Sequence, residues 1–172
     1  MPYDRYIEGE IYPREIINDE LGTRTGEGIF RERYSTRSKE GRVTAFSTKF
    51  GLLQYCYEDR CEGDIYLYYG MGSKEADISS LQNQYIIQHR ERGDDLIVFS
   101  EAENVPNYVR FLGQFDCYGY RHPVMTPFGR AIVFELTPKL PDVFRSLGIS
   151  EKCSEIARHR TWRHVPTRGP KD

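Results

Sequence analysis

The chain has 172 residues, of which 38% are hydrophobic and 13% aromatic, and its formal net charge is −2. This length suits one domain with a sizeable core, and the composition excludes a disordered chain. The near-neutral charge gives no general attraction to polyanions, and no apolar run approaches the ~18–20 residues of a membrane-spanning helix. The polar, acidic start MPYDRYIEGE shows no secretory signal, so we expect a cytoplasmic protein with reduced cysteines.

The first predicted elements lie in the N-terminal quarter of the chain. The run EGEIYPREII predicts a short strand followed by a helix or turn that opens near Pro13. Residues 21–42 combine several glycines with scattered charge, which predicts a long irregular loop. Loops of that length in compact domains are usually functional or disordered.

Basic residues are concentrated in two stretches of the chain. The first stretch contains Arg24, Arg31, Arg33, Arg37, Lys39, Arg42 and Lys49. The second, residues 152–171, contains Lys152, Arg158, Arg160, Arg163, Arg168 and Lys171 against Glu155 alone. This segregation permits a polyanionic partner, and ordinary mixed surface charge explains it equally well.

Most of the remaining chain reads as strands around one helix. Strands are predicted at residues 42–48, 52–57, 64–70, 95–100, 107–120 and 130–136. Residues 77–93 form the clearest helix, which Asp77 or Ser79 can cap and which Gly93 ends. In the long strand, Gly113 and Gly119 are expected at bulges or bends. Alternation there places one set of side chains on a common face, namely Val109, Phe111, Phe115 and Cys117.

Pro138 and Pro141 end the strand series. A short helix is expected from about Ser150, followed by a basic, proline-containing end. The order of elements predicts an α+β fold, with a curled and mainly antiparallel sheet, one central helix and a helical tail. We therefore divide the chain into a domain at residues 1–138 and a helical, basic extension at residues 139–172.

The stretch YCYEDRCEGDIYLYYG, residues 55–70, sets tyrosines on both sides of an acidic turn. Alternation puts Ile65, Leu67 and Tyr69 on one face, which we expect to be core, and Tyr66 and Tyr68 on the other. Cross-strand aromatic pairs of this kind stabilise a hairpin. The same residues could form a slot that stacks a planar base and matches its edge with a carboxylate, because aspartate accepts well from the cytosine amino group. Both interpretations remain open on this pattern alone.

The chain shows no convincing metal site or active site. Cys56, Cys61, Cys117 and His122 can be drawn as a zinc site, but their spacing is loose and Cys117 is expected to look inward. The histidines fit no nuclease metal pattern, and His89 is expected to pack or cap on the helix. The zinc-deaminase arrangement is also missing from the sequence. We predict no metal, no cofactor and no enzymatic activity.

The tyrosine-rich stretch and several others resemble the SRA (SET and RING-associated) domains, which read modified cytosine. YCYEDRCEGDIYLYYGMG is similar to the family's Y-x-D … Y-T-G-x-G segment. EGEIYPREIINDELGTRTGEGI is similar to G-x-I-Y-x-R-x-x … G-x-R-x-G-G-I, and LQNQYIIQH to N-x-A-I-x-x-H. NYVRFLGQFDCYGY and GRAIVFELTP follow in the family's order, so the resemblance covers about residues 9–138. It looks closest to the SRA-like domain of bacterial McrA-type HNH modification-dependent restriction enzymes.

The resemblance implies a PUA-like, crescent-shaped β-barrel that flips modified cytosine out of duplex DNA. It implies a modified-base pocket made by Tyr57, Asp59, Tyr68, Tyr69 and Gly70, with the base between Tyr57 and Tyr68. The DNA-contacting residues would be Arg24, Thr25, Gly26, Arg31, Arg33, Arg37 and Lys39. Two departures from the family leave alternatives open. The loop is one residue short, so Glu62 or Asp64 can take the place of Asp59, and Tyr69 stands where the family has threonine.

The resulting expectation is a reader of 5-methylcytosine in double-stranded DNA without catalytic activity. The alternatives are an RNA-binding PUA-like module and the DNA-recognition part of a modification-dependent nuclease. The expected partner is duplex DNA carrying modified cytosine, and no membrane; a homodimer and a partner nuclease remain open. The expected location is the cytoplasm of a bacterium, in association with the nucleoid.

Overall fold

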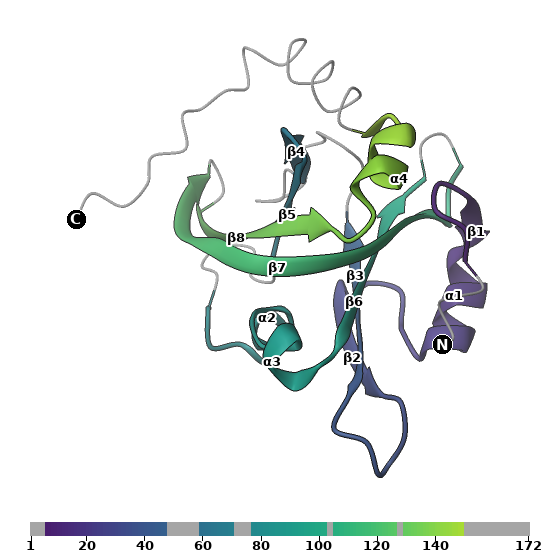
Figure 1. Ribbon diagram of the computed structural model, residues 1–172, viewed down its shortest axis with the longest axis horizontal. Helices are drawn as coiled ribbons and strands as arrows, with labels where there is room; N and C mark the ends of the chain where they lie inside the picture. Colours follow the sequence, from purple (N-terminus) through teal and green to yellow (C-terminus); the bar gives the residue numbers. More distant parts are fainter. Residues whose placement is uncertain (1–5, 48–58, 71–76, 103–104, 127–128, 150–172) are drawn as a thin grey trace.

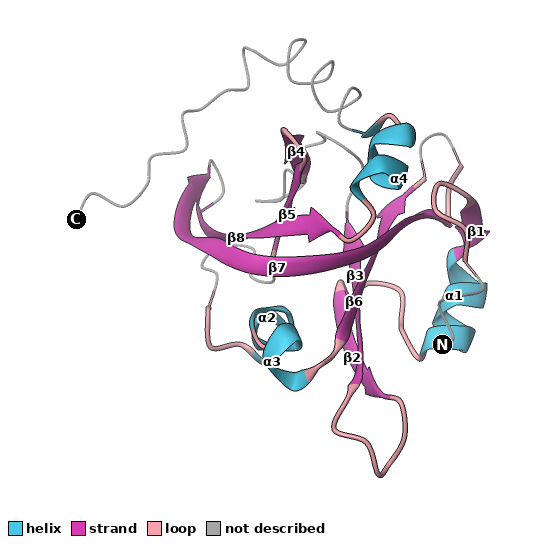
Figure 2. Cartoon of the chain, in the orientation of Figure 1, coloured by secondary structure: helices cyan, strands magenta, loops and turns pink. Residues whose placement is uncertain are grey.

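The computed structural model describes residues 6–47, 59–70, 77–102, 105–126 and 129–149. Within these ranges the chain forms eight strands and four helices (Figures 1 and 2). The strands are β1 (Ile11–Pro13), β2 (Ile29–Arg33), β3 (Gly41–Ser47), β4 (Arg60–Glu62), β5 (Ile65–Tyr69), β6 (Asp95–Glu101), β7 (Tyr108–Thr126) and β8 (Gly129–Pro138). The helices are α1 (Arg14–Leu21), α2 (Leu81–Ile87), α3 (His89–Arg92) and α4 (Pro141–Ser146).

All eight strands belong to one curved sheet. Its order is β2-β3-β6-β7-β8-β5-β4, and β1 pairs with β7 beside this path. The β3–β6 pairing is parallel and the other pairings are antiparallel, so the expected mainly antiparallel sheet is confirmed. The expected barrel is wrong for the described chain, because β2 and β4 end the path at opposite edges and do not pair with each other. Closure of a barrel requires that the first and last strands pair.

Strand β7 holds the sheet together, since it pairs with β1, β6 and β8 along its 19 residues. In Figure 1 it runs with β8 as a long curved ribbon across the molecule. The predicted bulges are both present, near Gly113 against β6 and near Gly119 against β8.

The first bulge changes which face the side chains of β7 occupy. Phe111 pairs with Phe99, whereas Gly113 pairs with the adjacent Val98, so Leu112 is the extra residue. Val109 and Phe111 therefore join one core cluster while Phe115 and Cys117 join another. The expectation that all four share a face is wrong, because an inserted residue reverses the alternation of a strand.

Two core clusters lie on opposite faces of the central strands. The larger one gathers alternate side chains of β3, β6 and β8 with Ile86 of α2 and Phe144 of α4. The second packs Ile17 and Leu21 of α1 on the other face, against Ile97 and Phe99. The side chains of successive residues of β6 thus pack alternately into the two clusters, as expected for a strand buried on both faces.

The helices before Gly93 lie where they were predicted, but their division and their N-cap residue differ from the prediction. Helix α1 begins directly after Pro13, as expected. The single helix predicted at residues 77–93 is divided at Gln88 into α2 and α3. Its N-cap is Ser80, which accepts from the Asn83 N–H, and not Asp77 or Ser79. Gly93 ends it in the left-handed conformation, as predicted. No helix in the described ranges is long and apolar enough to cross a membrane.

The remaining differences concern the predicted loop, one predicted strand and the C-terminal extension. Residues 21–42 are not an irregular loop throughout, because β2 forms within them and pairs with β3. The strand predicted at residues 52–57 and the helix predicted from Ser150 lie outside the described residues. Helix α4, in the predicted extension, packs Phe144 edge-on against Phe115 and Tyr66 of the large cluster.

Candidate nucleic-acid interface

The tyrosine hairpin is formed by β4 and β5 and is covered on both faces. Strand β5 lies between β4 and β8, with Tyr68 opposite Phe134 of β8. Leu67 and Tyr69 pack into a small cluster with β8, as the predicted core face requires. Tyr66 and Tyr68, however, belong to the large core cluster on the other face. Their face is therefore core as well, because α4 and the β3–β6 strands cover it.

Asp59 is a buried carboxylate at the start of this hairpin, with only 1% of its surface exposed. Its Oδ1 accepts from the backbone N–H of Tyr69 at 2.7 Å, and its Oδ2 accepts from Ser47 Oγ at 2.6 Å. The Tyr66 hydroxyl is hydrogen-bonded to the same Ser47 oxygen. A buried charge is tolerated only when it is hydrogen-bonded, and donors at both oxygens match the ionised form of the carboxylate.

Tyr68 is held at both ends. Its ring lies in the large core cluster with 3% of the residue exposed. Its hydroxyl donates to the carbonyl oxygens of Phe46 (3.1 Å) and Gly28 (3.3 Å). The same Gly28 carbonyl accepts from the Phe46 N–H, so the tyrosine is tied to the end of β3 and to the segment that enters β2. Its predicted stacking partner, Tyr57, lies outside the described residues.

Tyr69 and Gly70 complete the described part of the predicted pocket. Tyr69 is buried on the opposite face, and its hydroxyl accepts from Arg60 Nη1 at 3.2 Å. Gly70 donates its N–H to the Ile132 carbonyl. A Cβ atom at Gly70 would lie 2.5 Å from Asn83 Oδ1 and 2.6 Å from the Phe134 ring, so a larger residue there would force these side chains to shift.

The alternative acidic residues of the hairpin lie at its exposed tip. Glu62 pairs with Arg121 at 3.2 Å, which lowers the pKa of the Glu62 carboxyl. Asp64 pairs with Arg145 of α4, also at 3.2 Å. Glu62 and Asp64 thus form exposed ion pairs. Of the three candidate carboxylates only Asp59 is buried, and it lies beside β5, the strand that carries Tyr68.

The predicted DNA-contacting loop divides into exposed and structural residues. Arg24, Arg37 and Lys39 are exposed, and Arg24 makes a surface pair with Glu27 at 3.0 Å. Thr25 Oγ1 accepts from Asn18 Nδ2. Gly26 has φ 93° and open space around its Cα, so this turn presents backbone to solvent.

Arg31 and Arg33 have structural partners. Arg31 donates from Nε and Nη2 to both oxygens of the buried Asp94, at 2.7 and 3.0 Å. This contact raises the pKa of the Arg31 guanidinium. Arg33 donates to the carbonyls of Ser38 and Thr36 and so closes the β2–β3 loop. The charge of Arg31 is therefore neutralised within the protein, whereas Arg33 stays exposed and its guanidinium is held in place by carbonyl groups.

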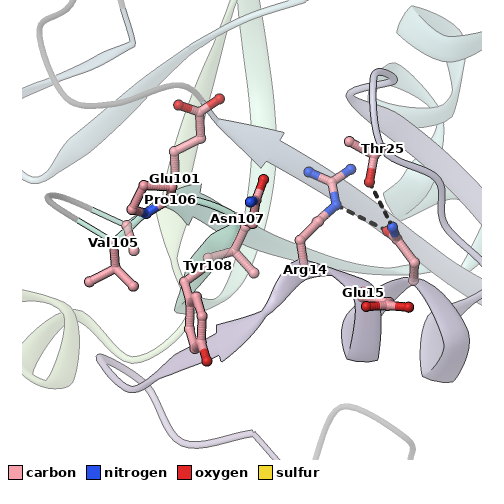
Figure 3. A pocket seen from close by; sticks show the side chains of 11 residues that line it. Arg14, Glu15, Thr25, Glu101, Val105, Pro106, Asn107 and Tyr108 are labelled. Carbon is pink, nitrogen blue, oxygen red and sulfur yellow. Dashed lines mark hydrogen bonds between the residues drawn. The ribbon is translucent and has the colours of Figure 1, made fainter.

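Sequence reasoning assigned no role to Arg14, which lines a cavity of about 540 Å³ (Figure 3). Its guanidinium carbon lies 3.3 Å from the centroid of the Phe46 ring. Its N–H groups donate to Asn18 Oδ1 and to the carbonyls of Arg24 and Glu27, so it fixes the predicted DNA loop to α1. Burial lowers the pKa of Arg14 to about 10, which leaves it charged at neutral pH. The only signal in the sequence was the match of YPRE to a family motif.

The zinc arrangement can be tested in part. Among the described residues no group of three or more histidine, cysteine or acidic side chains could hold a metal ion. Burial raises the pKa of Cys117 to about 12, which disfavours the thiolate form that zinc binds. His122 is exposed, and Cys56 lies outside the described residues.

No family model matches the sequence, and no curated protein matches it. Solved structures do match. The SUVH5 SRA domain bound to fully hydroxymethylated CG DNA has a TM-score of 0.56 at 14% identity, covering 77% of this chain and 88% of that one. The SUVH5 SRA complex with hemi-methylated CG DNA has the same TM-score and coverage at 16% identity. KRYPTONITE in complex with mCHH DNA, an H3(1-15) peptide and SAH has a TM-score of 0.58 at 11% identity, covering 77% of this chain and 32% of that one. The chain therefore has the fold of an SRA domain.

Proposed function

We propose that this chain reads 5-methylcytosine in double-stranded DNA by flipping the base into the hairpin site, without catalysing a reaction. Two lines of argument support the proposal. The fold is similar to SRA domains whose structures contain methylated or hydroxymethylated DNA. The single observation that carries it is the buried, hydrogen-bonded carboxylate of Asp59 beside the strand that holds Tyr68.

The chemistry of the site fits a flipped cytosine. Extrusion costs a few kcal/mol of unstacking and unpairing. Stacking between Tyr68 and Tyr57 would return about 1–3 kcal/mol per base. The cytosine N4 amino group donates, and Asp59 offers the acceptor for it. Backbone groups of Tyr69 and Gly70 would border the same pocket from the end of β5, since the Tyr69 side chain lies on the opposite face.

The exposed cations would contact the DNA backbone. Arg24, Arg37 and Lys39 can approach phosphates, while Thr25 and Gly26 allow the loop to come close. We propose weaker roles in DNA contact for Arg31 and Arg33, because both side chains have partners within the protein. Phosphate contacts of this kind make affinity depend on salt and not on sequence.

The test is a set of duplexes that differ at one position only, with cytosine, 5-methylcytosine or 5-hydroxymethylcytosine. A fluorescent base analogue next to that position reports flipping. We expect Asp59→Ala and Tyr68→Ala to lose most of the preference for the modified duplex. Equal affinity of the wild-type protein for modified and unmodified duplexes would refute the reader function.

Two further arms decide between the proposal and its alternatives. A structured RNA is used as a competitor, and we expect it to displace modified DNA poorly; displacement at lower concentration than DNA would favour an RNA-binding module. Modified plasmid is incubated with Mg²⁺ or Mn²⁺, and we expect it to remain intact. Cleavage would favour a nuclease.

A further inference from the structure

A chain of hydrogen bonds behind Asp59 determines what the candidate site can bind. We infer that Ser47 and Tyr66 make the site select cytosine over thymine, by holding Asp59 as a pure hydrogen-bond acceptor. This inference rests on the proposed function, since it concerns the base that would enter the same site. Ser47 and Tyr66 are positioning residues here, because they act through Asp59.

The hydrogen bonds run in one direction. Ser47 has one hydroxyl proton and donates it to Asp59 Oδ2 at 2.6 Å. The Tyr66 hydroxyl must then be the donor in its contact with the Ser47 oxygen. The Tyr69 N–H donates to the other carboxylate oxygen at 2.7 Å. Each of these donors therefore faces an acceptor, and all three hydrogen bonds run toward the carboxylate.

The three side chains that form these hydrogen bonds are shielded from water. The exposed fraction is 0% for Tyr66, 2% for Ser47 and 1% for Asp59. In such surroundings a hydrogen bond cannot be exchanged for one to solvent, so loss of a donor is costly. Ser47 is brought to Asp59 by β3, and Tyr66 by β5, so both positions are set by the sheet.

The acceptor state matters because 5-methylcytosine and thymine carry the same methyl group. They differ at position 4, where cytosine has an amino donor and thymine a carbonyl acceptor. An ionised carboxylate has no proton to offer, so it pairs with the amino group and opposes the carbonyl. A protonated carboxyl group could donate to the thymine oxygen. The bonds from Ser47 and Tyr69 favour the ionised form, and with it the rejection of thymine.

The experiment compares two ligands in each variant, so that a general loss of stability cancels. One duplex carries 5-methylcytosine opposite guanine, and the other carries thymine opposite guanine at the same position. The mismatch makes thymine easier to flip, so selection against it has to come from the site. We expect the wild-type protein to prefer the 5-methylcytosine duplex.

Ser47→Ala removes the donor to Oδ2, and we expect the affinity ratio of the two duplexes to fall roughly tenfold. Tyr66→Phe keeps the ring and removes only the first donor, so the ratio should fall by a smaller factor. Ser47→Thr keeps the hydroxyl and should restore the wild-type ratio. These three variants separate the hydroxyl from the packing of the site.

Ser100 supplies a matched control. It lies on β6 directly opposite Ser47 in the β3–β6 register and is also fully buried. Its Oγ has no hydrogen-bond partner in the part of the chain that the structure describes. Ser100→Ala thus removes a buried hydroxyl from the neighbouring position without touching Asp59, and we expect the ratio to stay at the wild-type value.

The outcomes separate this inference from the proposed function. If the wild-type protein prefers 5-methylcytosine to cytosine but Ser47→Ala and Tyr66→Phe keep the wild-type ratio against thymine, the inference fails and the reader function stands. A wild-type protein that fails to prefer 5-methylcytosine to thymine also overturns the inference. Binding that ignores the modification overturns both.

Discussion

His89, the first residue of α3, joins the helix to the sheet through both nitrogens of its ring. Nε2 lies 3.0 Å from the Cys117 N–H and accepts from it, so Nδ1 carries the proton and donates to the Asp94 carbonyl at 3.1 Å. The residue is 1% exposed. The ring is therefore neutral, and the expectation that His89 has a packing role is confirmed. Its burial also lowers the pKa of the imidazole below 6.5.

This shift predicts how stability depends on pH. The unfolded chain binds a proton at His89 near pH 6.5, and the folded chain does so only at lower pH. The contribution of His89 is therefore fully present above pH 6.5 and is lost as the pH falls through the folded-state pKa, by at most about 1.4 kcal/mol per pH unit. Urea unfolding at pH 7.5 and 5.5 should show a smaller decrease in the free energy of unfolding for His89→Gln than for the wild type.

Equal slopes for the wild type and His89→Gln would contradict the assignment. At the same residue scale, the resemblance singles out Asp59 as a candidate site residue, whereas nothing in the sequence points to Ser47 as its partner. A serine in a strand pattern gives no sign of its partner, because that partner lies 12 positions away, directly before β4.

At the scale of the elements, the positions of most strands could be predicted from the sequence, but the register in which they pair could not. Alternation and turn residues predicted β3, β5, β6 and β8 within two residues of their observed bounds, and β7 except for its last six residues. Strand β2 was missed because IFRER is short and half charged, and only its pairing with β3 makes it a strand. The reversal of faces in β7 was also missed, although Gly113 and Gly119 were predicted as bulges, because it depends on the register with β6.

The two bulge glycines give a matched prediction. Gly113 has φ 105°, where a side chain is strained, and a Cβ atom there would lie 3.2 Å from Glu8 Cγ. Gly113→Ala should lower the free energy of unfolding by about 1–3 kcal/mol. Gly119 has no positive φ, and a Cβ atom would meet only Glu135 Oε1 at 3.7 Å, an ordinary contact. Gly119→Ala should change stability by less than about 1 kcal/mol. Urea unfolding of both variants tests this prediction. Similar decreases in the free energy of unfolding for the two variants would mean that backbone strain at position 113 does not cause the loss of stability.

At the scale of the whole molecule, the fold decides which positively charged side chains remain at the surface, where a polyanion could reach them. The sequence shows a basic stretch between residues 22 and 49, but it cannot show which charges fold inward. Arg31 reaches Asp94, 63 positions along the chain, and Arg42 is 3% exposed beside Glu32. Such pairs depend on the approach of β2, β3 and the turn before β6. Counting basic residues therefore overestimates the polyanion-binding surface of this loop.

Arg31 and Arg37 test this division, because each carries one positive charge, Arg31 on β2 and Arg37 in the loop between β2 and β3. Arg31 is 16% exposed and its partner's side chain is fully buried, so Arg31→Gln leaves the Asp94 carboxylate without its cation. Breaking such a buried pair costs about 3–5 kcal/mol, and we expect that loss in urea unfolding. Arg37 is exposed and has no hydrogen bond or ion pair to another residue of the described ranges, so Arg37→Gln should leave stability unchanged.

The two substitutions should have the opposite ranking in DNA binding, where we expect Arg37→Gln to have the larger effect. Where Arg37 neutralises a phosphate, Arg37→Gln lowers the affinity for modified and unmodified duplexes by the same factor. It also reduces the slope of log affinity against log salt by about 0.9, because one fewer counterion is released. Arg31→Gln, measured at a temperature where it is folded, should keep the wild-type slope, since its charge is neutralised within the protein. A reduced salt slope for Arg31→Gln with an unchanged slope for Arg37→Gln would reverse the assignment of the two residues.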